Sequence, residues 1–405
     1  PRLPQAGPLV ARAPRTGEPA IESKRSRDDE EWDAQQAAKQ KALKNPQNVF
    51  GLAHRISKQL NISWNHERWP FDFADITNNA GERSYLALIH ADGNSLGQSW
   101  MDIVGQARET SGADEALMAI YPDFSNAIEE TSLYALSTAL KPILDAAESV
   151  EGRYPVRPIL CAGDDVTLVL RADLALQFAQ GYLNAFEFKS KELLQILRTQ
   201  HGTLGAKLPE VIRAGMGIAF VKERFPFAQA YELCESLCAY VKKASRDHSG
   251  LAFHRVTTSA TDAYEDLIKM ELSSQDKKRV LTMNPYFLNS PETCHPLIED
   301  LVEAVQASVE LPRGPLREAA AEAMVSCDLA EKRMERLREV ARRREGAQWP
   351  PFETAIQKLL GETESKSLLW RQVDSAHCTP LNDILELKAL SRFEKTDEAN
   401  TKPAS

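Results

Sequence analysis

The sequence of 405 residues lacks the long apolar runs of a membrane protein. No stretch approaches the roughly 18 consecutive apolar residues that a membrane span needs. The N-terminus also has no apolar core of a signal peptide. These absences predict a cytoplasmic protein without a membrane partner. The chain begins at Pro1 without Met, which leaves open whether the start is trimmed or further residues precede it.

Cysteine and several catalytic signatures are scarce or missing. The six cysteines form no CxxC pair, which argues against a zinc ribbon, and their scatter favours reduced thiols over a disulfide framework. The chain has no GxxxxGKS/T loop, no GxSxG elbow and no HExxH helix. The motifs of a P-loop NTPase, an α/β-hydrolase and a zincin are therefore absent.

Positive charge is in deficit. Lys and Arg number 49 against 58 Asp and Glu, so the net charge is −9. Bulk charge therefore does not favour binding to DNA or RNA, although a local basic groove or a nucleic-acid activator stays open. The other proportions, 43% apolar and 26% charged residues, are those of a globular protein.

The first 82 residues are expected to be a lead-in to the main domain. Residues 1–48 should be flexible, because five prolines fall in the first 19 residues and a charged run follows. Residues 49–82 combine helical spacing with a cluster of Trp and Phe. We expect this cluster to pack the lead-in onto the next domain; a base-stacking platform is the alternative.

Residues 83–256 carry the most informative pattern. An apolar strand at 84–89 is followed by two strands, 157–161 and 166–170, which are apolar on both faces and separated by four residues, as in a hairpin. A helix at 122–150 should begin at Pro122 and end or kink at Pro142. Further helices are expected at 173–202 and 226–245, and further strands at 211–221 and 251–256. This order predicts an α/β (α+β) fold with a central, mainly antiparallel sheet. Residues 257–405 should form a mostly helical C-terminal region with a polar tail.

Two adjacent acids at the tip of the hairpin are the strongest chemical signal. A turn accounts for one Asp, whose side chain caps backbone N–H groups, but accounts less well for both Asp164 and Asp165. Asp92 ends the upstream strand and would face this tip. Three close carboxylates repel one another unless a cation neutralises them, and hard oxygen ligands favour Mg²⁺ or Mn²⁺. Two such ions can activate a sugar hydroxyl against an α-phosphate.

Small and polar residues beside these acids are candidates for contacts with nucleotide. Gly93, Gly97 and Gly163 allow phosphates to approach the backbone closely. Asn94 and Ser95 continue the loop after the first strand. We take Gly93, Asn94, Ser95 and Gly163 as nucleotide-binding candidates.

Other conspicuous residues have simpler structural interpretations. His90 shares a strand face with Asp92, but a core or edge histidine is the simpler expectation. Two glycines in strand 211–221 should permit close packing rather than bind a dinucleotide. Cys234 and Cys238 lie one turn apart on an apolar helix face and are expected to be core thiols.

Three segments carry a resemblance to a known family: ALIHADGNSLG, RPILCAGDDVTLVL and AGMGIAFVKERFPFAQAYELCESLCAYVKKA. In order and spacing they resemble the polymerase-type palm of the large subunit of type III CRISPR effector complexes, which is related to GGDEF nucleotidyl cyclases. The resemblance covers residues 83–256. It implies a ferredoxin-like palm that joins nucleoside triphosphates, often ATP, into cyclic or short oligonucleotide signals in antiviral defence.

The resemblance also assigns roles to individual residues. Asp92 matches the metal ligand of the first strand, and the carbonyl of Gly93 would be a second ligand. Asp164 and Asp165 match the acidic pair of the family's GGDD motif. Lys242 or Lys243 matches the lysine that holds triphosphate, and the sequence leaves this choice open. Palms of this type often react in pairs, so a homodimer or a partner palm protein is expected.

Departures from the family pattern keep alternatives open. Ala162 replaces the first Gly of GGDD, and Asn94 stands where many relatives have a second Asp. The HD nuclease domain and zinc-binding CxxC elements of the effector subunit are missing, which suggests a standalone palm protein. One alternative is a catalytically degenerate, nucleotide-binding scaffold subunit of a CRISPR-like or defence complex. Another is a template-directed polymerase, against which the acidic balance and the lack of clear finger and thumb domains argue.

Overall fold

The computed structural model describes two short strands at 22–24 and 30–32 and residues 50–77, 85–109, 113–148, 152–257, 263–289, 295–343, 349–361, 367–373 and 375–390. These residues fall into two compact units, Pro1–Trp69 and Pro70–Ser405. The first unit holds the antiparallel strands β1 (Glu22–Lys24) and β2 (Glu30–Trp32), the helix α3 (Gly51–Gln59) and a 3₁₀ turn at His66–Arg68. Most of the lead-in predicted at 1–48 lies outside the described residues.

The aromatic cluster of the lead-in is divided between the two units. In the first unit, the Trp64 ring meets His54 edge-on, with 5.0 Å between the ring centroids. In the second unit, Phe73 stacks on Phe227, at 6.0 Å between centroids, and packs against the core of the sheet. Phe71 is exposed, with the Arg157 guanidinium over its ring. At least Phe73 therefore packs on the main domain, and the base-stacking alternative stays a prediction.

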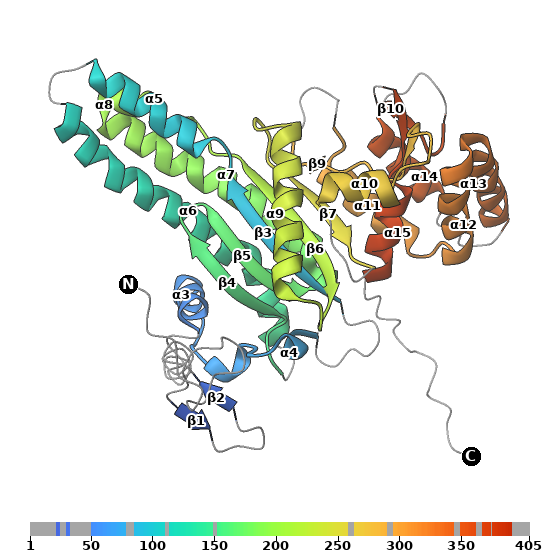
Figure 1. Cartoon of the computed structure of the whole chain (residues 1–405), viewed down its shortest axis with the longest axis horizontal. Coiled ribbons are helices and arrows are strands. Elements are labelled where there is room, and N and C mark those ends of the chain that lie inside the picture. The colour runs from blue at the N-terminus through green and yellow to red at the C-terminus, as the bar shows by residue number, and fades with distance from the viewer. Residues whose placement is uncertain are drawn as a thin grey trace, which may run out of the picture. The chain divides into compact units, whose positions relative to one another are not determined.

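Six strands of the second unit form one sheet in the order β4–β5–β3–β6–β7–β9 (Figure 1). Their bounds are Tyr85–Gly93 for β3, Val156–Ala162 for β4, Asp165–Arg171 for β5, Ala214–Lys222 for β6, Gly250–Arg255 for β7 and Tyr286–Phe287 for β9. Neighbouring strands are antiparallel except β6 and β7, which are parallel. The structure confirms a mixed α/β fold with a mostly antiparallel sheet and a helical C-terminal region.

Strand β9 was not predicted. It comes from the region expected to be helical and extends the sheet beyond residue 256 by pairing with Gly250 and Leu251 of β7. A strand of two residues is too short to show the alternation of apolar and polar side chains by which strands are recognised. Its pairing depends on tertiary contacts.

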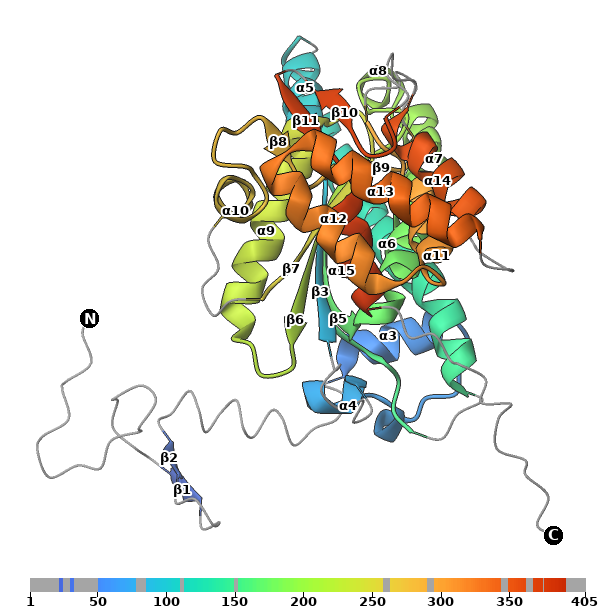
Figure 2. The ribbon, with the colours of Figure 1, turned by 90° about the vertical axis from the view of Figure 1, so that its right-hand side faces the viewer.

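Helices cover both faces of the sheet (Figure 2). Helix α9 (Phe227–Ala244) packs against β3, β6 and β7. Helices α6 (Ala113–Glu148) and α7 (Ala175–Gln200) pack along one another on the opposite side. Helix α5 (Leu96–Arg108) follows β3 directly and leads into α6.

Helix α6 differs from its prediction, because a start at Pro122 and an end or kink at Pro142 were expected. The helix includes both prolines within its 36 residues. A proline removes one backbone hydrogen bond from a helix interior. Buried side chains around the second proline, including Leu140 and Ile143, belong to the stretch that packs along α7 and compensate for this loss.

Close packing of α9 on β6 depends on two glycines. A Cβ atom at Gly217 would lie 2.1 Å from the carbonyl oxygen of Cys234, so no other residue fits without moving the helix. The thiol of Cys234 donates to the carbonyl of Leu88 at 3.1 Å, and that of Cys238 to the carbonyl of Gly215 at 3.3 Å. The close-packing glycines and the core thiols are both confirmed. No disulfide links the described cysteines.

The C-terminal region consists mainly of helices, as predicted. These are α10 (Tyr264–Glu271), α11 (Ile298–Ser308), α12 (Arg313–Val325), α13 (Cys327–Arg342), α14 (Trp349–Leu360) and α15 (Leu381–Leu390). A small sheet that was not predicted joins β10 (Arg371–Val373), β11 (Ala376–Cys378) and β8 (Arg279–Val280). Among the described residues no helix is long and apolar enough to cross a membrane.

A buried carboxyl links this region to the main sheet. Asp383 of α15 accepts hydrogen bonds from the hydroxyl of Tyr286 at 2.6 Å, the backbone N–H of Met283 at 2.8 Å and the hydroxyl of Thr282 at 3.1 Å. Burial raises the pKa of Asp383 to about 7, although the three hydrogen bonds oppose this rise. The side chain thus connects α15 to β9, which forms the edge of the sheet.

Candidate functional site

Strand register brings the predicted acids to the same end of the sheet. Leu86 and Leu88 of β3 point into the core beneath α9, so alternation places His90 and Asp92 on that face as well. Ala91 pairs with Val166 of β5, and Asp165 precedes Val166 on that strand. Asp165 and Asp92 therefore lie beside one another at adjacent strand ends.

The turn of the hairpin places Asp164 against the end of β3. Gly163 adopts a left-handed conformation, with φ of 61°, which glycine does without strain. A Cβ atom at Gly93 would lie 3.0 Å from both Cβ and Oδ2 of Asp164, so the backbone of β3 and this side chain are in close contact. These two glycines thus permit a tight turn and a close contact within the protein, and their approach to phosphates stays a prediction.

Burial and the charge of Asp92 raise the pKa of both carboxyl groups at the hairpin tip. Burial, followed by a hydrogen bond with Asp92 and its negative charge, raises the pKa of Asp164 to about 7. Burial and the charge of Asp92 also raise the pKa of Asp165. Carboxylates brought this close together favour either a shared proton or a bound cation.

The structure distinguishes between the two candidate lysines. Lys242 Nζ donates to the carboxylate of Asp92 and, at 2.8 Å, to the carbonyl oxygen of Gly93. Lys243 points elsewhere, forming an ion pair with Glu265 at 2.6 Å through a side chain that is 73% exposed. Gly215 of β6 lies beneath Lys242, where a Cβ atom would be 3.0 Å from the lysine Cγ. Only Lys242 of this pair is brought to the acids.

Asn94 and Ser95 form the loop between β3 and α5. The amide of Asn94 donates to the carbonyl of Arg246 at 3.1 Å, and its backbone N–H donates to the carbonyl of Arg213 at 2.7 Å. The side chain is 6% exposed, yet its Oδ1 accepts no hydrogen bond within the described part of the chain. Ser95 has a φ of 61°, which is uncommon for a residue other than glycine and typical of functional loops.

A polar network beneath the acids was missed by the sequence analysis. His90 Nδ1 lies 3.1 Å from the hydroxyl of Thr167, and its ring meets that of Tyr231 at 5.4 Å between centroids. Burial, followed by the charge of Glu235, raises the pKa of Tyr231. Glu235 precedes Lys242 by seven residues, or two helical turns, and this spacing was the available signal.

His90 is buried in the core and contacts a neighbouring strand. Its side chain is 6% exposed, and burial lowers the pKa of His90 although the nearby charges of Asp165 and Asp92 raise it. A neutral, buried imidazole that bonds to a neighbouring strand fits the expectation of a core histidine.

The oxygen atoms at this edge of the sheet are suitable ligands for a hard cation, but their arrangement is not that of a complete metal site. Asp92, Asp164 and the carbonyl of Gly93 offer the oxygen ligands that Mg²⁺ and Mn²⁺ prefer. Within the described ranges, however, no three His, Cys, Asp or Glu side chains are arranged to hold one metal ion together. The Lys242 ammonium contacts two of the donors, so a cation that binds both requires this lysine to move.

Comparisons with known proteins give no family for this chain. No protein-family model matches the sequence, and a search of curated proteins finds no significant match.

The raised pKa of Asp164 predicts a measurable pH dependence of stability. The pKa of Asp164 is about 7 in the folded protein and 3.8 for an ordinary Asp. At a pH between these two values, the folded state therefore binds a proton that the unfolded state does not. This group therefore lowers the free energy of unfolding as pH rises from about 4 to about 7. In metal-free buffer, Asp164→Asn should lose less thermal stability between about pH 5 and about pH 8 than wild type does.

The comparison with the variant isolates Asp164 from other groups. Burial also raises the pKa of Asp383 to about 7 and that of Glu386 to about 8, and both contribute to the wild-type pH dependence. An Asp164→Asn variant that melts with the same pH dependence as wild type would contradict the prediction.

Proposed function

We propose that this protein is a metal-dependent nucleotidyltransferase that joins ATP or other nucleoside triphosphates into a cyclic or short oligonucleotide second messenger, with a role in antiviral defence. The observation that carries the proposal is the meeting of Asp92, the Asp164–Asp165 tip and Lys242 at one end of the sheet. These residues come from the three segments that resemble the CRISPR palm family.

The order of elements supports a ferredoxin-like palm as the scaffold. Strand β3, helices α5 and α6, strands β4 and β5, helix α7 and strand β6 follow one another in the chain. With β3 and β5 central and β6 and β4 outside them, they give the strand–helix–strand–strand–helix–strand pattern of that fold.

Each acidic residue has a proposed role in the reaction. Asp92 and Asp165 would hold Mg²⁺ or Mn²⁺ together with the Gly93 carbonyl, and Asp164 would act as a further ligand or a support. When bound, the metal ions activate a ribose hydroxyl and stabilise charge on the transferred and leaving phosphates. The hydroxyl oxygen forms a bond to the α-phosphorus and loses its proton to water. The bond from that phosphorus to the oxygen it shares with the β-phosphate breaks and releases pyrophosphate.

Lys242 is the proposed ligand for the triphosphate. Its ammonium contacts Asp92 and the Gly93 carbonyl. A bound cation would take over both oxygens, and the lysine would then be available for the phosphates. Asn94, Ser95 and Gly97 precede or begin α5, where backbone N–H groups favour a bound phosphate. A homodimer or a partner palm protein is proposed to supply the second nucleotide.

Product analysis by mass spectrometry tests the proposed reaction. The purified chain is incubated with all four nucleoside triphosphates and Mg²⁺ or Mn²⁺, beside a matched sample containing a chelator. We expect an oligonucleotide and pyrophosphate only in the sample with metal, because the leaving group needs charge neutralisation. Binding of nucleotide without product, in every oligomeric and partnered state tried, would contradict the proposal.

A nucleotide-binding scaffold is the second candidate. It is favoured by the Lys242–Asp92 ion pair, by the departures at Ala162 and Asn94, and by the lack of a three-residue metal group among the described residues. Under this proposal, the site would bind nucleotide with no release of pyrophosphate, and charge-removing changes at Asp165 would leave the function of the complex unaltered.

A further inference from the structure

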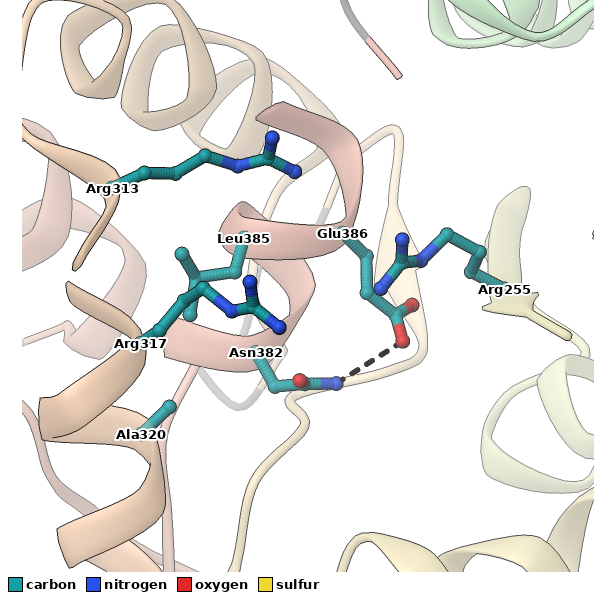
Figure 3. Close-up of a pocket in the computed structure, with 7 residues that line it drawn as sticks. All are labelled: Arg255, Arg313, Arg317, Ala320, Asn382, Leu385 and Glu386. Atoms are coloured by element: carbon teal, nitrogen blue, oxygen red, sulfur yellow. Dashed lines mark hydrogen bonds between the residues drawn. The ribbon is translucent and has the colours of Figure 1, made fainter. Parts of the chain in front are cut away.

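A second polar cavity lies away from the acidic site, where the sheet meets the C-terminal helices. It has a volume of about 260 Å³ and is lined by residues of β7, α12 and α15 (Figure 3). This is smaller than the roughly 300–1,000 Å³ of pockets for drug-sized molecules. The cavity therefore suits a small group rather than a whole nucleotide.

Three arginines converge on this cavity from two elements. Arg313 and Arg317 extend from α12, and Arg255 extends from the end of β7 toward them (Figure 3). The Nε atom of Arg255 is buried and has no hydrogen-bond partner within the described ranges. A guanidinium presents planar, paired donors that match the oxygens of phosphate. The lining thus offers several charged donors to one small volume.

Two of the arginines lie in the first turns of α12. Arg313 is the first residue of the helix, and the described first turn contains no acidic residue. The helix dipole favours negative charge at an N-terminus and disfavours cations there. A bound anion would offset both the dipole and the repulsion between Arg313 and Arg317.

One acidic residue, Glu386, lines the cavity together with the arginines. Glu386 is 7% exposed and accepts a hydrogen bond from the amide of Asn382 at 3.3 Å. Burial raises the pKa of Glu386 to about 8, although the charge of Arg255 opposes this rise. Burial thus favours the uncharged form of this carboxyl beside the arginines.

We propose that this arginine cavity binds a diphosphate or triphosphate group. The small volume and the net negative charge of the chain argue for a compact polyphosphate rather than a nucleic acid. Because Arg255 belongs to the sheet and Arg313 and Arg317 to the C-terminal region, one ligand would hold these two parts together. The inference does not depend on the chemistry proposed at the end of β3.

Calorimetric titration of the full chain with sodium pyrophosphate in metal-free buffer tests the cavity. Wild type is expected to bind, and Arg317→Gln should weaken binding about tenfold or more, the loss typical of hydrogen bonds to a charged group. Arg317→Lys should fall between them, because it keeps the charge but loses the paired donors. The matched control is Arg336→Gln, which removes one charge from an exposed position of α13 outside the cavity and should bind as wild type does.

Three outcomes would overturn the proposal: no binding by wild type, equal weakening by Arg336→Gln, or binding lost in Lys242→Gln but kept in Arg317→Gln. The last would place pyrophosphate at the end of β3 instead. Parallel titrations with tripolyphosphate and ATP distinguish the source of the phosphate group. Arg317-dependent binding of tripolyphosphate alone would support a free inorganic polyphosphate, and such binding of both would support the phosphate tail of a nucleotide.

Discussion

Asp165→Asn is expected to reduce oligonucleotide synthesis by more than about 100-fold. Loss of residues that merely orient metal ligands already costs about 10–100-fold in metal affinity or activity, and Asp165 is proposed to be a ligand itself. Asparagine keeps the size and hydrogen-bonding capacity of the side chain but removes its charge. The measurement is the rate of pyrophosphate release at saturating nucleotide and Mg²⁺, together with the melting temperature of each protein.

The stability of this variant separates catalysis from folding. Burial and the charge of Asp92 raise the pKa of Asp165, so its carboxylate is disfavoured in the folded state. Asp165→Asn should therefore melt at the wild-type temperature or above it. The matched control is Asp145→Asn, at an exposed position of α6 whose carboxylate pairs with Lys141, and it should leave the rate unchanged. Wild-type activity in Asp165→Asn would remove the basis of the proposed function.

Gly217→Ala is expected to be the most destabilising small substitution in the second unit. Its new methyl group would lie 2.1 Å from the carbonyl oxygen of Cys234, which belongs to the backbone of α9 and cannot rotate away. Overpacking of this kind costs about 1–3 kcal/mol, and the contact here favours the upper end of that range. Displacement of α9 would also withdraw Lys242 from Asp92, so nucleotide binding should weaken in parallel.

A second glycine provides the control for this experiment. Gly105 lies on the exposed side of α5, and no described atom lies within 4 Å of the position of a new Cβ. Gly105→Ala should stabilise the protein by about 0.5–1 kcal/mol, because alanine loses less conformational freedom in a helix. Thermal and denaturant unfolding measure both variants. Equal stability of Gly217→Ala and wild type would show that α9 is not held against β6 as closely as the structure indicates.

Much of the sheet could be predicted from the sequence because the signals are local. The hairpin of β4 and β5 has two apolar strands joined by a short Asp-rich turn, and β3 is an apolar run that ends in Asp92. The bounds of helix α6 were harder to predict. Pro122 and Pro142 are local signals for the start and the end of a helix, but packing along α7 overrides both signals. Strand β9 could not be predicted, because two residues are too few to show an alternation of apolar and polar side chains.

Some residues of the candidate site could be predicted from local sequence patterns, whereas others could be identified only from the tertiary structure. Asp164 and Asp165 are conspicuous in the sequence because a turn in an apolar hairpin accounts for one acid but less well for two, and Asp92 ends the apolar strand upstream. The choice between Lys242 and Lys243 depends on how α9 is rotated about its axis, because neighbouring side chains of a helix point about 100° apart. That rotation depends on Gly215 and Gly217, over which the helix packs.

The sequence by itself determined the class of fold, the hairpin that presents the acids and the residue types that suit a hard cation, because each follows from patterns within a few residues. Only the tertiary structure decided which lysine meets Asp92, how Asp164 approaches Gly93, and that Arg255 joins Arg313 and Arg317 around one cavity. Arg255 ends β7, whereas Arg313 and Arg317 belong to α12, and helices α10 and α11 lie between these two segments in the chain. Their meeting depends on how α12 and α15 pack beside the sheet, and no local pattern encodes it.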